Sequence, residues 1–539
     1  MPHRVRRPTR PKPRRRPRKR RPTSLRKRRR KHLPSSESGR DITGNGGSHP
    51  EGAIRRFRSL VPMTPDKTLL SSDDSKNLRA ARRRVAAMAD AVPCDRTRIQ
   101  VNPRLELVAV SVRDTPSKGV QMGSGFWVVW RDPSDGVVHE EEAGPADLLA
   151  LKLVLEERDA EDAAREAGVP VGRIDDCLWG AVARGLIIMP PSRLRRPPSW
   201  PVPAEGEDLL AARVFTLQWH ITQECDLHCL HCYDRTSQGV FSLLLGGKLL
   251  DDLRRFCAER FVRGQVSFTG GNPFLHPDFA TLYGAALDRG LSVAILGNPV
   301  SREQLLGIVA LGRPVYYQVS LEGLEAHNDH IRGAGHFRRT LAFLDLLREE
   351  GIPCEIMLTL TRDNMDQVLA LGEILRGRAD AFSFNRLAPF GEGASLALPE
   401  PEEYEAFLDR YVAAMEENPV LALKDNLLNL ALSRQRRLLF DGCAGFGCGA
   451  AFNFLSVLAD GQVHACRKFP SPIGSVHGSS LSELYDSPAA ERYRSRSLAC
   501  EGCRLYSRCG GCPAVTAGLG LDPLRDRDPF CFHRSSRSG

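Results

Sequence analysis

Three cysteines that directly follow a predicted buried strand constrain this chain more than any other feature. Residues Val214–Ile221 are rich in β-branched and aromatic side chains, as buried strands are. Cys225, Cys229 and Cys232 follow in CxxxCxxC spacing on one loop. Three thiolates on one loop can hold an iron–sulfur cluster and leave one iron open to a small molecule. The loop leaves the carboxyl end of a strand, where parallel α/β folds place their chemistry.

Strand-like runs alternate with amphipathic helices from residue 214 to about residue 395. This alternation predicts repeated βα units and a parallel sheet, and therefore the α/β fold class. Six strands are too few for a closed eight-stranded barrel, so we expect a partial (β/α)6 TIM-like barrel over residues 211–399. The predicted strands are Val214–Ile221, Gln265–Thr269, Leu291–Leu296, Val315–Leu321, Cys354–Leu360 and Ala381–Asn385.

The positive charge is confined to the N-terminal end. The net charge is +11, but residues 1–32 alone contribute +18, which leaves −7 for the remainder. Residues 1–60 carry few apolar side chains and are predicted to be a disordered basic tail. Phosphate binding is open to such a tail, but it lacks the aromatic interleaving of sequence-specific readers. A solvated extension, with Met63 or Met88 as the true start, is the simpler interpretation, and nucleic acid is not an expected partner.

The predicted cellular compartment determines how the many cysteines are interpreted. No run of 18 or more apolar residues and no apolar signal segment appears, which predicts a cytoplasmic protein without a membrane partner. Fifteen cysteines in such a chain indicate metal ligation rather than disulfides, because the cytosol keeps thiols reduced.

A small module is predicted over residues 99–190. Strand-like runs at Leu105–Val112 and Gly125–Arg131 precede three helical patterns, and Leu186–Met189 resembles a short wing strand. This order predicts a winged-helix-like module, followed by a Pro/Arg-rich linker at Pro190–Pro203. The third helical stripe consists of Ile174, Cys177, Leu178, Ala181 and Val182.

The C-terminal part is predicted as a helical linker over residues 400–440 and a cysteine-rich domain over residues 441–535. Little periodic pattern is present in the latter, so we expect metal rather than an apolar core to organise it. A zinc ribbon remains open here, because Cys500, Cys503, Cys509 and Cys512 could form one tetrahedral site. The eight cysteines are Cys443, Cys448, Cys466, Cys500, Cys503, Cys509, Cys512 and Cys531.

The cysteine loop and barrel strongly resemble the radical SAM superfamily. Gly270-Gly271-Asn272-Pro273 resembles the family's Gly-Gly-Glu-Pro run, with Asn272 in place of Glu. The resemblance implies that Cys225, Cys229 and Cys232 hold a [4Fe-4S] cluster whose open iron binds S-adenosylmethionine. A zinc knuckle on the same loop would need a fourth ligand. Segments Gln318–Gly323 and Ile331–Gly333 resemble those that hold the cofactor's ribose and carboxylate. The implied cofactor-binding residues are Gly270, Gly271, Asn272, Ser320 and Arg332.

The resemblance implies specific roles for two side chains. The amide carbonyl of Asn272 would receive the methionine ammonium, and the planar fork of Arg332 would bind a carboxylate through two charge-assisted hydrogen bonds. No general base is evident. Glu322 and Glu392 lie near strand ends but are no better candidates than their neighbours, so the catalytic residue stays unknown.

The C-terminal cysteines resemble the SPASM extension of radical SAM enzymes, which carries two auxiliary [4Fe-4S] clusters. Full ligation by four thiolates would suit both for electron transfer. The implied ligands of the first auxiliary cluster are Cys443, Cys448, Cys466 and Cys512, and those of the second are Cys500, Cys503, Cys509 and Cys531.

The module at residues 99–190 resembles the RiPP recognition element, which captures a precursor's leader as an extra strand at a sheet edge. Winged helices also bind DNA, but the acidic run Glu140–Glu142 would repel phosphate. These resemblances imply an oxidoreductase that reductively cleaves S-adenosylmethionine and abstracts hydrogen from a ribosomally made precursor peptide. A reductant such as flavodoxin or ferredoxin would be a partner. Segments Tyr317–Gly323, Phe384–Ala394 and Cys448–Phe454 resemble maturases for thio(seleno)oxazole-type peptides.

Two other functions remain open from the sequence. An anaerobic sulfatase-type maturase oxidises a Cys or Ser of a protein partner and shares the SPASM pattern, but such enzymes generally lack a leader-binding domain. A non-enzymatic iron–sulfur protein that binds nucleic acid would combine a winged helix with the basic tail, and it would not turn over S-adenosylmethionine.

Overall fold

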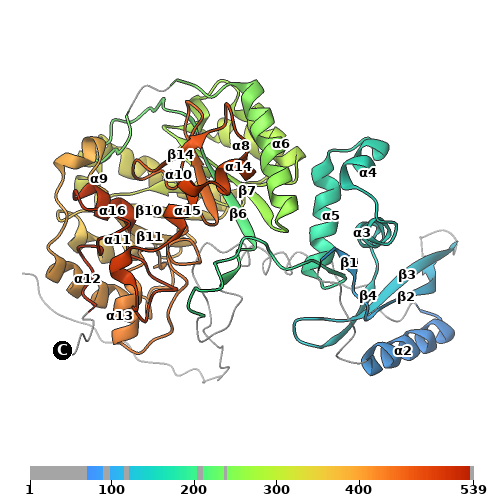
Figure 1. The fold of residues 1–539 in the computed structure, drawn as a ribbon. Helices are drawn as coiled ribbons and strands as arrows, with labels where there is room; N and C mark the ends of the chain where they lie inside the picture. The colour runs from blue at the N-terminus through green and yellow to red at the C-terminus, as the bar shows by residue number, and fades with distance from the viewer. Residues whose placement is uncertain (1–69, 89–96, 115–120, 203–209, 236–238, 534–539) are drawn as a thin grey trace, which may run out of the picture. The chain divides into compact units, whose positions relative to one another are not determined.

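The computed structural model describes residues 70–88, 97–114, 121–202, 210–235 and 239–533 (Figure 1). The predicted basic tail and Met63 lie outside these residues. Among the described helices, none has the length and apolar character needed to cross a bilayer.

The N-terminal part contains the predicted strands and helices and one helix that the sequence did not suggest. That helix, α2, packs Leu78, Ala81 and Val85 against Val108 and Trp127 of a three-stranded antiparallel sheet in the order β2-β3-β4. The sheet is therefore covered on this face. The elements are α2 (Ser72–Ala87), β1 (Gln100–Val101), β2 (Leu105–Asp114), β3 (Gln121–Arg131), β4 (Val138–Glu142), α3 (Pro145–Leu155), α4 (Ala160–Ala167), α5 (Val171–Ala183) and β5 (Ile187–Ile188).

Strand β3 is buried on both of its faces. Trp127 and Val129 face α2, whereas the alternate residues Val128 and Trp130 join a second apolar cluster with α3 and α5. The predicted wing is the short strand β5, which pairs with β1 in antiparallel register. The order of strands, three helices and a final strand is the one the sequence predicts.

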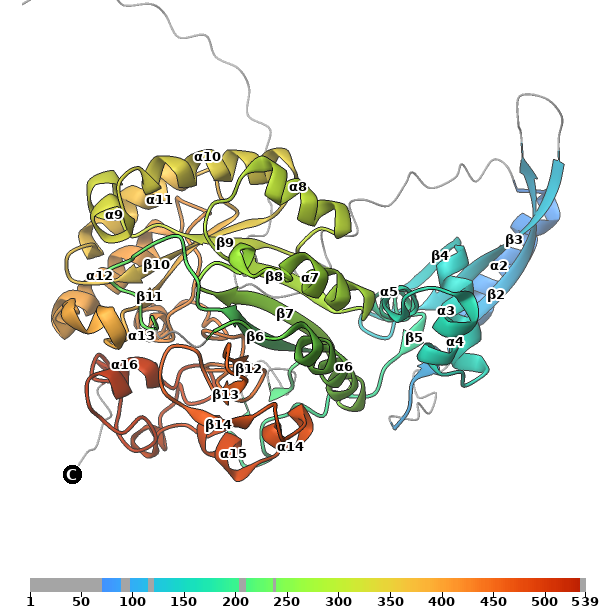
Figure 2. The same ribbon diagram turned by 90° about the horizontal axis from the view of Figure 1, so that it is seen from above.

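Six parallel strands form the central sheet, in the order β11-β10-β9-β8-β7-β6. Helices lie along the outer side of this curved row of strands (Figure 2). The predicted open α/β barrel is thus confirmed. Its elements are β6 (Val214–Thr222), α6 (Leu243–Glu259), β7 (Arg263–Gly270), α7 (Phe279–Asp288), β8 (Ser292–Leu296), α8 (Arg302–Leu311), β9 (Tyr317–Ser320), α9 (Glu325–Arg332), α10 (His336–Glu349), β10 (Cys354–Leu360), α11 (Val368–Leu375) and β11 (Ala381–Arg386).

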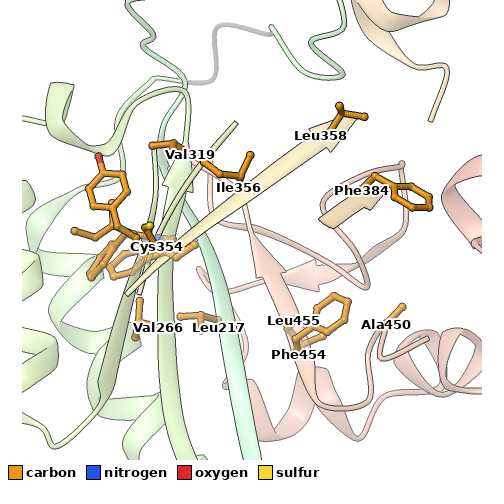
Figure 3. Close-up of a cluster of buried hydrophobic side chains, with 14 of the residues drawn as sticks. Leu217, Val266, Val319, Cys354, Ile356, Leu358, Phe384, Ala450, Phe454 and Leu455 are labelled. Atoms are coloured by element: carbon orange, nitrogen blue, oxygen red, sulfur yellow. The ribbon is translucent and has the colours of Figure 1, made fainter. Parts of the chain in front are cut away.

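The two faces of this sheet differ in chemistry. On the outer face, Leu217, Trp219 and Val266 pack into the main apolar core (Figure 3). Helix α6 approaches so closely that a Cβ at Gly246 would lie 3.0 Å from the Trp219 ring. Alternate residues point the other way, since side chains alternate along a strand. The opposite face carries Gln218, His220, Ser267, Thr269, Gln318, Ser320, Glu355, Met357, Thr359, Ser383 and Asn385.

The C-terminal part continues the barrel sheet, which the sequence did not predict. Strand β12 pairs in parallel with β6, and β13 and β14 follow in antiparallel register. Leu455, Val457 and Val463 are fully buried in the barrel's own core. The expectation that no apolar core helps to organise this region is therefore wrong. The elements are α12 (Pro401–Ala414), α13 (Leu428–Arg434), β12 (Phe454–Val457), β13 (Gln462–His464), β14 (Pro472–Ser475), α14 (Leu481–Tyr485), α15 (Pro488–Arg494) and α16 (Pro513–Gly518).

Candidate functional site

The cysteine loop leaves β6 and packs tightly against the end of β7. Backbone hydrogen bonds join Gly271 N to the Thr222 carbonyl at 2.9 Å and Asn272 N to the Glu224 carbonyl at 2.7 Å. A Cβ at Gly270 would lie 2.0 Å from the Thr222 oxygen, and Gly270 has a φ of +125°. Only glycine fits there. The predicted Gly-Gly segment thus holds the start of the cysteine loop.

Asn272 and Asn298 hold a carboxylate that lies between the first two loop cysteines. Asn272 Nδ2 donates to Asp226 Oδ1 at 2.9 Å, and Asn298 Nδ2 donates to the same oxygen at 2.6 Å. Asn298 Nδ2 also lies 3.5 Å from Cys225 Sγ. The Asn272 carbonyl oxygen accepts from Phe274 N at 3.3 Å. The amide of Asn272 therefore positions the Asp226 carboxylate, a role that the sequence did not indicate.

Arg332 lies beside the second cysteine of the loop. Its Nε and Nη2 donate to Glu322 Oε1 at 2.9 and 2.6 Å, and its Nη1 lies 3.8 Å from Cys229 Sγ. Burial raises the pKa of Glu322, but the charges of His231 and Arg332 and a hydrogen bond from Thr359 N outweigh it, so the pKa is lowered. Glu322 is therefore held as a carboxylate.

Four of the five residues predicted for cofactor contact lie against the loop. Gly270, Gly271 and Asn272 contact its start, and Arg332 reaches its second cysteine. Ser320 lies at the carboxyl end of β9. The roles given to these residues stay predictions. Glu322 is engaged in its ion pair, which makes it a poor general base.

Four of the C-terminal thiols form one group. The pKa of Cys466 is raised to about 12, mainly by burial, with contributions from the nearby thiols of Cys448 and Cys512. Burial also raises the pKa of Cys443, and Cys448 contributes to that shift. These four cysteines are the set implied for the first auxiliary cluster.

The other four thiols line a common pocket. Cys500, Cys503, Cys509 and Cys531 all contribute to its wall. Burial raises the pKa of Cys531, and the thiol of Cys503 contributes. These are the four cysteines implied for the second auxiliary cluster.

The spacing of the sulfur atoms tests the zinc alternative. A tetrahedral zinc site with bonds of about 2.3 Å needs sulfurs about 3.8 Å apart. Within the described ranges, no three cysteine sulfurs all lie within 4.8 Å of one another. Moreover, Cys512 lies with the first group rather than with Cys500 and Cys503. This grouping of Cys512 with Cys448 and Cys466 differs from a zinc ribbon of Cys500, Cys503, Cys509 and Cys512 and agrees with the set that the resemblance implies for the first auxiliary cluster.

An unpartnered histidine lies on the polar face of the barrel. His220 is 1% exposed, and neither ring nitrogen has a hydrogen-bond partner among the described residues. Burial lowers its pKa to about 3, with help from Arg467 and His464. Arg467 Nη1 donates to Thr269 on the same face at 3.0 Å. A neutral imidazole therefore faces a polar interior, although no sequence motif marked it.

Comparison with known families defines the class of the protein. Residues 219–374 match the radical SAM superfamily, and residues 448–513 match SPASM, an iron–sulfur cluster-binding domain. The first match contains the three loop cysteines and the second contains six of the C-terminal ones. The chain is therefore a radical SAM enzyme with a SPASM domain. Its cofactors are S-adenosylmethionine, a [4Fe-4S] cluster and auxiliary iron–sulfur clusters.

Sequence identity to individual relatives is low. An AdoMet-dependent heme synthase of Methanosarcina barkeri is 24% identical over 60% of this chain and 97% of its own. The mycofactocin maturase MftC of Mycobacterium ulcerans is 28% identical over 58% of this chain and 87% of its own. The crystal structure of Streptococcus suis SuiB bound to precursor peptide SuiA is similar in fold. It has a TM-score of 0.51 and 17% identity, and the match covers 76% of this chain and 97% of SuiB.

Proposed function

We propose that this enzyme is a radical SAM maturase of a ribosomally made precursor peptide, whose leader is captured by the module at residues 99–190. The extent of the likeness to SuiB supports this proposal most strongly. Residues 211–535 are 325 of the 539 residues, or about 60% of the chain. A match that covers 76% must therefore include residues before the barrel. SuiB was crystallised with a precursor peptide.

Bound together, the loop cluster and S-adenosylmethionine supply a radical that removes a hydrogen atom from the substrate. Cys225, Cys229 and Cys232 would hold that cluster. Asp226, fixed by two amides, would offer its carboxylate to the methionine ammonium, which Asn272 as a neutral amide could bind only weakly. Arg332 keeps Nη1 directed at the loop while Glu322 holds the rest of its fork.

The polar face of the barrel would receive the peptide. Its side chains lie at the alternate positions that do not pack into the core. His220 lies on this face, and its buried nitrogens have no competing partner among the described residues, so its neutral imidazole could hydrogen-bond a bound peptide; its lowered pKa makes it a weak base. The SPASM clusters would pass electrons, with a flavodoxin or ferredoxin as reductant in the cytoplasm.

Leader capture would use a sheet edge of the N-terminal module. In the described sheet, β2 and β4 are the outer strands. An extended leader can pair with such an edge through backbone hydrogen bonds. Slower amide exchange in β2 or β4 on addition of the leader is expected, and unchanged exchange in both would contradict capture at this sheet.

The test is anaerobic co-expression with a precursor peptide encoded beside the gene, followed by mass spectrometry. We expect a mass change in the peptide and 5′-deoxyadenosine as a product. Deletion of residues 99–190 should abolish modification of the full precursor. Modification that survives this deletion would favour a sulfatase-type maturase, and reduced, reconstituted enzyme that never forms 5′-deoxyadenosine would favour a nucleic-acid-binding protein.

A tetrapyrrole substrate is the second candidate, because heme synthases are among the relatives. The Methanosarcina heme synthase is matched over 97% of its length by only 60% of this chain. The maturase MftC is matched by a similar share, 58%, so these two relatives do not separate the substrates, and the likeness to SuiB over 76% of this chain is what favours the peptide. Tight porphyrin binding together with no peptide modification would reverse this preference.

A further inference from the structure

Two arginines are buried at the junction of the two auxiliary cysteine groups. Arg196, from the segment predicted as a linker, is 3% exposed, and Arg496 is 6% exposed. Arg196 Nη2 donates to the Phe446 carbonyl at 3.1 Å and to the Cys448 carbonyl at 2.8 Å. Arg496 donates to the same two carbonyls, at 2.8 and 3.0 Å. Two cations thus share one pair of acceptors.

Aromatic rings and glycines surround these two arginine side chains closely. The Arg196 guanidinium lies over the Phe452 ring at 3.9 Å and the Trp200 ring at 4.5 Å. Gly447, with φ of +67°, has no space for a side chain, since a Cβ there would lie 2.0 Å from Arg496 Nη2. At Gly510, with φ of +92°, the Arg496 side chain occupies the space that a Cβ would need. Both glycines lie next to cysteines, so the arginines and the cysteine loops are packed as one unit.

No carboxylate balances either cation in the described part of the chain. Among the described residues, both guanidinium groups donate to backbone carbonyls, and Arg196 Nε has no partner there. Buried charges are costly unless they are paired. Cys448 of the first group hydrogen-bonds through its N to the carbonyl of Cys509 of the second, at 3.2 Å. The anions available nearby are therefore the thiolates of both groups.

We propose that Arg196 and Arg496 are the fixed counter-charge of the auxiliary clusters, so that cluster binding holds the 190–202 segment in place and the two cations raise the clusters' reduction potentials. This inference rests on the proposed auxiliary ligand sets but requires no peptide substrate. A precursor that is never modified would leave it intact. Its consequence is a coupling between the cluster domain and the segment that connects the N-terminal module to the barrel.

The direct test is an EPR-monitored redox titration of the reconstituted holoenzyme. Arg196→Gln should make the reduction potential of an auxiliary cluster more negative. A shift of about 59 mV corresponds to a tenfold change in the ratio of reduced to oxidised cluster at a fixed applied potential. Arg196→Lys keeps the charge and should stay near the wild-type value. Arg193→Gln is the matched control, because Arg193 lies in the same segment but stacks on Phe261. A wild-type potential in Arg196→Gln, or equal shifts in the Gln and Lys variants, would overturn the proposal.

A second measurement needs no variant. Limited proteolysis of wild-type enzyme should cut the 190–202 segment slowly in the holoenzyme and much faster after anaerobic removal of iron. Equal cleavage rates in the two forms would refute the coupling, even if the Gln variant could not be purified.

Discussion

At the scale of single residues, Asp226 carries the most specific expectation about cofactor binding. A hydrogen bond to a charged group contributes about 1.5–3 kcal/mol, or roughly 10- to 100-fold in affinity. Asp226→Asn should therefore weaken S-adenosylmethionine binding by that factor and leave the iron content unchanged. Glu392→Gln is the control, since Glu392 is an exposed carboxylate close to the same loop. Wild-type affinity in Asp226→Asn, measured by equilibrium binding, would exclude the proposed role.

A second residue-scale prediction concerns acid stability. Burial lowers the pKa of His336 to about 4, with help from Arg332 and Arg339. An unfolded histidine titrates near 6.5. The contribution of neutral His336 to the free energy of unfolding is therefore complete above that pH and is lost as the pH falls toward 4. The loss should reach about 3 kcal/mol. Urea unfolding of His336→Gln should depend less on pH in this window, whereas a variant at the exposed His477 should keep the wild-type dependence.

At the scale of elements, a buried ion cluster joins the barrel to the SPASM domain. Arg386 of β11 donates to Asp425 at 2.8 Å and to Asp528 at 2.7 Å, and Asp528 also accepts from Cys512 N at 2.8 Å. Arg386→Met leaves two buried carboxylates unpaired and should cost about 3–5 kcal/mol. The triple variant that also carries Asp425→Asn and Asp528→Asn should be more stable than the single one. The opposite order in urea unfolding would show that charge pairing is not what stabilises this contact.

The pairing of β12 with β6 gives a second prediction at this scale. Deleting residues 441–539 would expose the edge of β6 and the apolar residues that pack beside it. We expect the shortened chain to aggregate, as judged by size-exclusion chromatography. A shortened chain that is monomeric and unfolds cooperatively would contradict the shared core.

At the scale of the whole molecule, the sequence predicted what local patterns encode. The alternation of strands and helices predicted the open barrel, and the resemblance to SPASM implied the two cysteine groups, which spacing alone left open. The sheet continuation through β12 was missed because Phe454–Val457 is a short apolar run whose partner is more than 200 residues away. Asp226, His220 and Arg196 were missed for a similar reason, since their roles depend on contacts between distant segments and not on a motif.

The proposed activity depends on a loop cluster with one iron open to S-adenosylmethionine. The most direct test is EPR of the reduced holoenzyme whose auxiliary clusters have been removed by Cys-to-Ala substitution at Cys443, Cys448, Cys500 and Cys503. We expect a [4Fe-4S] signal that changes when S-adenosylmethionine is added and that is absent once Cys229 is also replaced by Ala. A signal indifferent to S-adenosylmethionine, or a loop filled with zinc, would contradict the account.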